Sequence, residues 1–385
     1  MTLREARVEV LSGATVAVSL VPEAVSFAMI VGAAPQVGLW AAFFMAISTA
    51  LFGGRPGLIS GATGATAVIM SELVRSHGMP MLYDGVVVAG IVQLIAWVTG
   101  SWKAFAKIPH GAVSGFLIAL ALLILSGQAR YLHVGDPSNG RIALTFAVAA
   151  ISALVMHLSS KRFKFPPAIS AIAIGSALGI PLCLATVGDL SHVSAALPTF
   201  KIPDLSLSTV LTVLPYSIGM AIAGLTESLL TVDSVSHRIN SHGDKGRETM
   251  AQGIGNVVSG LFSTMGGCVL VGQTNLNILS GARRRLSGIS AAIGLLLIVT
   301  FFAKYIEAVP LAGLIGVMLV VVYQTGDWRS IATRNVSKLA VILSTVIASL
   351  ASRNLAIGVI VGTFTFYLVK YIRNTKLANA KHKDS

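Results

Sequence analysis

The chain has 385 residues, of which 54% are hydrophobic and only 11% are charged. Because a soluble domain carries about 25% charged residues, this composition excludes an ordinary soluble protein and indicates a polytopic membrane protein. The net charge of +13 does not indicate a nucleic-acid binder, since the basic residues are spread over many short loops and form no single face. The two cysteines, Cys183 and Cys268, lie in apolar stretches and imply no disulfide framework.

The first apolar stretch, VAVSLVPEAVSFAMIVGAAP, carries Pro22 and Glu23 near its middle. It is long and lacks a cleavage pattern, so we interpret it as a retained span rather than a signal peptide. A proline there removes one backbone hydrogen bond and bends the helix. A carboxylate at bilayer depth is costly and is seldom kept without a use. Glu23 is therefore a candidate functional residue.

Further apolar segments of spanning length follow along the chain. We predict fourteen, at residues 8–32, 36–53, 59–75, 82–102, 109–128, 141–159, 166–183, 210–235, 247–263, 268–282, 286–303, 307–323, 337–351 and 354–372. The third and the tenth are poor spans, because they begin with the glycine-rich stretches GGRPGLISGATG and STMGGCVLVGQT. These stretches predict extended backbone that passes into a short half-helix.

The distribution of basic residues predicts the orientation. If the N-terminus is cytoplasmic and the spans alternate, only six of the 28 Lys and Arg residues fall on the opposite side, namely Arg75, Arg130, Arg141, Lys201, Lys304 and Arg353. The positive-inside rule expects this asymmetry. We therefore expect a multi-pass protein of the cell inner membrane with both termini in the cytoplasm. The run Arg283-Arg284-Arg285 is interpreted as a topology anchor.

Parts of the first half of the chain recur in the second half. VSLVPEAVSF resembles IAGLTESLLT, which places Glu23 opposite Glu227, and GLWAAFFMAISTALFGG matches ETMAQGIGNVVSGLFST. Since seven spans is an odd number, the two copies have opposite orientations and form an inverted repeat. We expect an all-α membrane fold with a first repeat at 1–183, a linker at 184–209, a second repeat at 210–372 and a cytoplasmic tail at 373–385.

The repeat predicts a binding site at the midplane. In inverted halves the N-termini of the two half-helices point at each other, and their free N–H groups and dipoles make an anion site. The candidate substrate-binding residues are Gly61, Ala62, Thr63 and Gly64 on one side and Gly272, Gln273, Thr274 and Asn275 on the other.

Two carboxylates flank this site. Glu227 and Glu23 lie on spans of the same core, where a carboxylate can bind a proton or help to hold a cation. We predict Glu227 as the proton-coupling residue and Glu23 as its partner, with Thr231, one helical turn after Glu227, as a possible coupling-ion ligand. The alternative is that Glu227 only braces a helix. The sequence contains no metal-ligand spacing, nucleophile elbow or phosphate loop, so we expect no enzyme, cofactor or metal site.

The stretches LVPEAVSFAMIVGAAPQVGLWAAFF, ALFGGRPGLISGATGATAVI, MAQGIGNVVSGLF and GQTNLNILSGARRRLSG occur in this order and together resemble the sulfate permease (SulP) family of anion transporters. The resemblance implies fourteen spans in a seven-plus-seven inverted repeat of the uracil-permease type. It also implies a core of spans 1–4 and 8–11 that moves against a gate of spans 5–7 and 12–14, with the anion between the third and tenth half-helices.

The chain departs from the family pattern in several places. Family members usually carry a cytoplasmic STAS domain after the last span, and this chain ends shortly past it, so we expect a bacterial member in which that domain is absent or was removed. Many relatives have an Arg where this sequence has Gln273. The stretch Cys268-Val269-Leu270-Val271 is apolar where sodium-coupled relatives have hydroxyl residues. These differences favour proton coupling over sodium coupling.

The sequence therefore predicts a secondary active transporter of a small anion, of the sulfate, bicarbonate or dicarboxylate class, which works as a proton symporter by alternating access. Open alternatives on the same fold are a sodium-coupled symporter, an anion exchanger and an uncoupled anion channel. A nucleobase permease is less favoured, because few polar side chains could recognise base edges. The expected partners are the anion, a proton or sodium, the lipid bilayer and a second copy in a homodimer, and no nucleic acid.

Overall fold

The computed structural model describes residues 1–134, 138–162, 167–240 and 242–381. Its first half contains α1 (Leu3–Val31), α2 (Pro35–Phe52), β1 (Ser60–Gly61), α3 (Gly64–His77), α4 (Met79–Thr99), α5 (His110–Ala129), α6 (Asn139–Arg162) and α7 (Pro167–Gly179). The second half contains α8 (Leu207–Arg238), α9 (Lys245–Leu261), β2 (Cys268–Val269), α10 (Val271–Leu279), α11 (Arg285–Phe301), α12 (Ala303–Glu307), α13 (Leu311–Thr325), α14 (Val336–Ser352) and α15 (Leu355–Lys381).

Each of the fourteen predicted spans corresponds to one helix, or to a strand followed by a helix, in this order. By length and composition, seven helical segments of the described residues could cross a membrane, and α7, α11, α13 and α14 are shorter apolar helices. The short helix α12 was not predicted. Helix α15 continues to Lys381 through most of the segment predicted as a tail, and residues 382–385 lie outside the described residues, as does Lys164 of the charge pattern.

Proline and glycine set several helix ends. Helix α2 begins at Pro35, and Pro109 and Pro310 directly precede α5 and α13. Proline suits the first helical position, that of Pro35, because its φ is already helical and its missing N–H is not needed in the first turn. Pro109 and Pro310 are N-cap residues with extended backbone. Helix α1 ends at Gly32, whose φ of +86° is left-handed, a conformation that glycine adopts without a Cβ clash. Inside α1 the helix continues through Pro22.

The third and tenth segments are half-helices, as predicted. Helix α3 has 14 residues and α10 has 9, whereas a spanning helix needs about 20. The strands that precede them pair antiparallel, with Ser60 opposite Val269 and Gly61 opposite Cys268. A Cβ on Gly267 would lie 1.8 Å from the carbonyl oxygen of Gly61. The close crossing of the two strands therefore requires glycine at this position.

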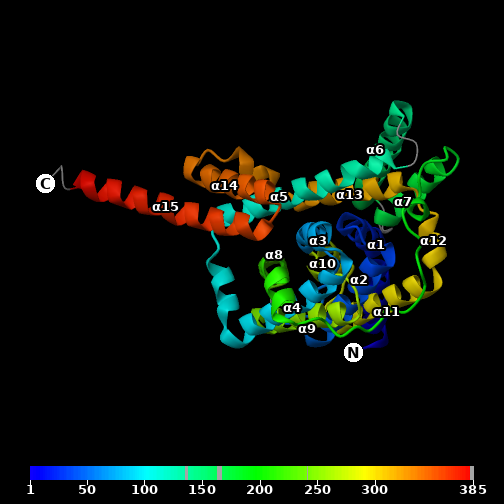
Figure 1. Ribbon diagram of the computed structural model, residues 1–385, viewed down its shortest axis with the longest axis horizontal. Coiled ribbons are helices and arrows are strands. Elements are labelled where there is room, and N and C mark those ends of the chain that lie inside the picture. Colours follow the sequence, from blue (N-terminus) through cyan, green and yellow to red (C-terminus); the bar gives the residue numbers. More distant parts are fainter. Residues whose placement is uncertain (135–137, 163–166, 241, 382–385) are drawn as a thin grey trace.

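The helices pack in two groups (Figure 1). In one group α1, α2 and α11 contact one another, and α4, α8 and α9 do the same, with α3 against α8 and α1. In the other group α5 packs on α13, α14 and α15, and α6 packs on α7 and α13. Figure 1 shows the second group as an elongated layer over the first. The assignment of the groups as a moving core and a gate remains a prediction.

A long connection links the two groups between α7 and α8. Near its start, the N–H of Val187 donates to the carbonyl oxygen of Val309 at 3.0 Å. Further along, the N–H of Lys201 donates to the carbonyl oxygen of Leu261 at 2.8 Å, at the end of α9. The connection therefore contacts the second group first and the first group afterwards, which ties the two groups together at this end of the molecule.

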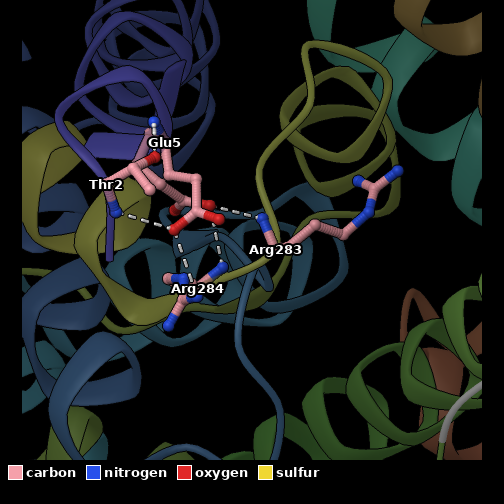
Figure 2. Close-up of polar contacts among 5 residues, drawn as sticks. Thr2, Glu5, Arg283 and Arg284 are labelled. Atoms are coloured by element: carbon pink, nitrogen blue, oxygen red, sulfur yellow. Dashed lines mark hydrogen bonds and ion pairs between the residues drawn. The ribbon is translucent and has the colours of Figure 1, made fainter. Parts of the chain in front are cut away.

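The start of α1 is fixed to the loop between α10 and α11 (Figure 2). The buried carboxylate of Glu9 accepts hydrogen bonds from the backbone N–H groups of Arg283 at 2.6 Å, Arg284 at 2.9 Å and Ser287 at 3.1 Å. The guanidinium of Arg284 lies 3.3 Å from the carboxylate of Glu5. These contacts supply acceptors for N–H groups at the start of α11 that have no partner within the helix.

The arginines interpreted as a topology anchor also cap helices. The guanidinium of Arg283 donates to the carbonyl oxygens of Ile278 at 2.8 Å and Ala282 at 2.6 Å. The guanidinium of Arg285 donates to the backbone carbonyl oxygen of Gly53 at 2.6 Å, just after α2. A cation at the end of a helix interacts favourably with the last carbonyl groups. The run therefore fixes the C-terminal ends of α10 and α2, whichever role it has in topology.

Candidate functional site

A cavity of about 510 Å³ lies where the half-helix α10 and the start of α3 face α5 and α13. Its wall on the first helix group includes Glu23 from α1 and Glu227 from α8. Its wall on the second group is mostly apolar and includes Leu120 and Ile124 of α5 and Val321 of α13. The cavity therefore lies between the two groups, at the tips of the half-helices.

Of the eleven residues predicted for the site, those that line the cavity are Glu23, Gly64, Glu227, Gly272, Gln273 and Asn275. The others, Gly61, Ala62, Thr63, Thr231 and Thr274, are buried behind this lining. Gly272 is exposed, and a Cβ built on it would meet nothing within 4 Å. The backbone in the first turn of α10 is thus directly accessible from the cavity, as an anion at a helix N-terminus would need.

Gln273 links the half-helix α10 to α1. Its amide nitrogen Nε2 donates to Oε1 of Glu23 at 2.8 Å. Its amide oxygen Oε1 is buried and has no hydrogen-bond partner within the described part of the chain. Because a buried acceptor without a donor is costly, this oxygen is suited to receive a hydrogen bond from a bound molecule.

Glu227 contacts a residue that the sequence analysis treated as apolar. The thiol of Cys268 donates to Oε2 of Glu227 at 3.2 Å, and its sulfur lies 3.0 Å from the hydroxyl oxygen of Thr63. The hydroxyl of Thr231 donates to the backbone carbonyl of Glu227 at 2.7 Å, not to its carboxylate. The side-chain partner of Glu227 in this structure is therefore Cys268, from strand β2.

Thr274 and two residues that the sequence analysis missed hold the strands in place. The hydroxyl oxygen of Thr274 accepts the N–H of Ile59 at 3.0 Å, just before β1. The hydroxyl of Ser228 accepts the N–H of Val269 at 3.1 Å. The side-chain amide of Asn256 forms two hydrogen bonds with the backbone of Gly267. Its oxygen accepts the N–H of Gly267 at 2.9 Å, and its nitrogen donates to the carbonyl oxygen of Gly267 at 3.1 Å. These residues satisfy strand groups that lie at membrane depth, where water is scarce.

The charged side chains that line the cavity are all acidic. Among the residues that the structure describes, the lining contains two carboxylates, those of Glu23 and Glu227, and no Lys, Arg or His. Glu23 is 6% exposed and Glu227 is 8% exposed. The positive potential available to an anion therefore comes from the N-termini of α3 and α10. An ionised carboxylate would oppose that potential at short range.

The cavity extends toward one end of the molecule. Its lining includes Met156 near the end of α6, Pro167 at the start of α7 and Thr325 at the end of α13. These helix ends adjoin loops that are rich in Lys and Arg, which the positive-inside rule predicts to be cytoplasmic. At the opposite end Arg130, which follows α5, donates to the carbonyl oxygen of Met29 at 2.6 Å and also to that of the next residue. The second group is therefore fastened to the end of α1 on the side away from the cavity mouth.

A sequence model described as the sulfate permease family matches residues 7–173 and 139–349, which together cover most of the chain. The chain belongs to the sulfate permease family. This confirms the predicted resemblance. It also confirms that this chain is not an enzyme, since the family consists of transporters.

Among curated relatives, this family member is 34% identical over 386 residues to YbaR of Bacillus subtilis (strain 168), a protein named for sulfate transport. The match covers 98% of this chain and 80% of YbaR. It is 29% identical over 349 residues to the bicarbonate transporter BicA of Synechocystis sp., with 83% of this chain and 61% of BicA covered.

Two solved structures share the fold. The transmembrane domain of a cyanobacterial BicA matches with a TM-score of 0.80 and 24% identity, covering 95% of this chain and 98% of that one. The murine Solute Carrier 26 family member A9 anion transporter in the inward-facing state matches with a TM-score of 0.82 and 15% identity. This match covers 97% of this chain and 69% of the murine chain. These matches confirm the predicted all-α membrane fold with an inverted repeat.

Proposed function

We propose that this permease is a secondary active transporter that carries a small anion together with protons across the cell inner membrane. The observation that carries the proposal is the cavity at the tips of α3 and α10, which is lined by Glu23 and Glu227 and by no basic residue of the described part of the chain. YbaR is named for sulfate transport and BicA for bicarbonate transport, which supports a small oxyanion as the substrate.

The charges of the cavity give the reason for coupling. Two like unit charges 4 Å apart repel by about 4 kcal/mol at an effective dielectric constant of 20. An anion at the tips of the half-helices would meet this repulsion from an ionised Glu23 or Glu227. A proton or a cation on one carboxylate removes the repulsion, so the anion and the positive charge bind together. We propose Glu227 as the coupling residue and Glu23 as its partner. Glu23 is hydrogen-bonded to Gln273 at the start of α10.

The surroundings of Glu227 support a proton rather than sodium. Hard cations take several oxygen ligands, but the side-chain partner of the Glu227 carboxylate is the thiol of Cys268. The hydroxyl of Thr231 donates its hydrogen bond to the backbone carbonyl of Glu227, not to the carboxylate. A proton needs none of these ligands.

The lining favours a monovalent oxyanion that carries a hydroxyl group, such as bicarbonate. The amide oxygen of Gln273 has no donor in the described part of the protein, and a hydroxyl of the substrate would supply one. A divalent anion such as sulfate at neutral pH has no donor and meets twice the repulsion from a carboxylate. Sulfate and dicarboxylates would then require more protons for each anion.

The two helix groups provide the means of transport. The group of α1–α4 and α8–α11 carries the half-helix tips and both carboxylates, whereas the other group supplies the apolar wall. We propose that the first group moves as the core against the second as the gate, which exposes the cavity to each side in turn. The excess of basic residues near the cavity mouth supports a cytoplasmic location for that end and for both termini.

The test is uptake of labelled bicarbonate, sulfate and a dicarboxylate into proteoliposomes under an imposed pH gradient, with and without sodium. Accumulation of one anion that follows the pH gradient and ignores sodium is expected for the wild type. The Glu227→Gln variant should lose gradient-driven accumulation. The matched control is Glu72→Gln, which makes the same change in a residue that is paired with Arg75 at the surface.

Three outcomes would contradict the proposal. Accumulation that requires a sodium gradient would indicate a sodium symporter. Uptake that depends on an anion inside the vesicles would indicate an exchanger. A current that persists without any coupled gradient would indicate a channel.

A further inference from the structure

A second cavity, of about 520 Å³, lies between the starts of α5 and α14 and the later part of α15. These three helices contact one another, and Figure 1 shows them together at one edge of the molecule. None of the residues that line this cavity lines the transport cavity. We refer to the second cavity as the α15 groove.

The α15 groove has an apolar part and a basic part. On α15, Phe366 and Val369 are followed by Lys370 and Arg373, and this spacing of three, four and seven residues places all four on one helix face. Val341 of α14 adds to the apolar wall. The lining therefore changes from apolar to cationic along the helix, in the direction that leads from the bilayer to the adjoining loops.

The basic part contains four side chains, those of His110, Lys338, Lys370 and Arg373. Among the described residues, no Asp or Glu lines the groove. Lys370 and Arg373 are exposed and form no ion pair among the residues that the structure describes. Helices α5 and α14 also begin here, so the positive ends of their dipoles add to the potential.

One neighbouring acid offsets part of this charge. Asp327 accepts hydrogen bonds from the hydroxyls of Ser114 at 2.7 Å and Ser330 at 2.6 Å. Burial acts to raise the pKa of Asp327, but these hydrogen bonds outweigh it and hold the pKa below its usual value. Asp327 therefore stays charged at neutral pH and interacts with Lys338. The positive charges of Lys370 and Arg373 remain available to a ligand.

We propose that the α15 groove binds an anionic glycerophospholipid of the surrounding membrane. The phosphate and its headgroup would lie against Lys370, Arg373 and His110, and the acyl chains along Phe366, Val369 and Val341. Basic pockets between membrane helices on the cytoplasmic side recognise anionic headgroups in this way. A free phosphate would use only the basic part of the groove, whereas a lipid uses both parts.

Native mass spectrometry of the purified protein tests this proposal. The protein is mixed with phosphatidylglycerol or with phosphatidylcholine of the same acyl chains, and the retained lipid is counted. We expect one tightly retained phosphatidylglycerol and little phosphatidylcholine. The Lys370→Gln/Arg373→Gln variant should bind phosphatidylglycerol at least about tenfold more weakly, because each basic side chain near a membrane surface contributes about 1 kcal/mol.

The matched control is Arg329→Gln/Arg334→Gln, which removes the same charge from two exposed residues that do not line the groove. The control should retain the lipid, and circular dichroism should show equal helix content in both variants. Equal retention of the two lipids would overturn the proposal, as would equal weakening in both variants. Displacement of the lipid by millimolar glycerol 3-phosphate would show that the groove recognises a free phosphate, which also overturns it.

Discussion

At the scale of single residues, the site combines a carboxamide, a thiol and two carboxylates. Gln273 donates to Glu23 at 2.8 Å, and Cys268 donates to Glu227 at 3.2 Å. Each pair joins a residue of the second repeat's half-helix segment to a neighbouring full helix. A shift of that segment relative to α1 or α8 would therefore change the hydrogen bonding of a carboxylate directly, which is how anion binding and proton binding could affect each other.

Gln273→Arg should change the preference among anions. The new guanidinium would lie beside Glu23 and pair with its carboxylate, so the cavity would gain a fixed positive charge. We expect the ratio of sulfate uptake to bicarbonate uptake to rise by about tenfold or more, since a divalent anion gains more from that charge. Competition between the two labelled anions in proteoliposomes measures the ratio. The neutral variant Gln273→Met is the control, and an equal change in both variants would refute the charge argument.

At the scale of elements, the half-helix α10 depends on its connections at both ends. At its start, Thr274 accepts the N–H of Ile59. At its far end, Arg283 caps its last turn, and Glu9 of α1 holds the loop that follows. These anchors explain how a helix of only 9 residues keeps its position, because isolated helices of that length are marginal in water.

Glu9→Ala should destabilise the protein. Three backbone N–H groups, those of Arg283, Arg284 and Ser287, lose their acceptor, and each buried unsatisfied group costs about 1–3 kcal/mol. We expect a clear drop in the thermal unfolding midpoint in detergent, and a smaller drop for Glu9→Gln, which keeps one acceptor oxygen. Glu5→Gln, at an exposed position, is the control. Unchanged unfolding in Glu9→Ala would show that water replaces the carboxylate at no cost.

Arg130 is the second element-scale connection, because it fastens the helix group of α5 to the end of α1. If the cavity must open at this end during transport, the contact has to break. Arg130→Met should therefore favour opening there. A Gly272→Cys reporter in a Cys183→Ser background should react more with an impermeant thiol reagent added outside when Arg130 is replaced. An unchanged labelling rate from outside, with normal labelling from the other side, would contradict this role.

At the scale of the whole molecule, the lengths of the apolar segments, the internal repeat and the family resemblance predicted the fold. Apolar length gave the fourteen segments in their order, and the glycine-rich stretches marked the two strands and half-helices. Helix α12 was missed because five residues carry no recognisable period. For the site, a carboxylate within an apolar segment, the internal repeat and the glycine-rich half-helix starts identified Glu23, Glu227 and Gln273. They could not show that Thr63 and Thr274 lie behind the lining, because this depends on how the strands cross.

Cys268 is a site residue that the sequence pattern could not identify. In the sequence it stands within an apolar run, and a buried cysteine usually behaves as a small hydrophobic residue. Its contact with Glu227 arises only because β2 pairs with β1 and packs against α8. The α15 groove likewise combines α5 with the consecutive helices α14 and α15, which lie far from α5 in the chain. Its basic residues therefore appeared in the sequence only as scattered loop charges.

The most direct measurement is the number of protons that enter a proteoliposome with each anion. A pH-sensitive dye inside the vesicles, followed together with the uptake of labelled sulfate or a labelled dicarboxylate in the absence of sodium, gives this number. Bicarbonate is unsuitable for this readout, because a proton that enters with it leaves the vesicle as CO2. The proposed coupling through Glu227 predicts that the lumen acidifies in step with anion uptake and that Glu227→Gln abolishes this acidification. Anion uptake without any acidification in the wild type would contradict it.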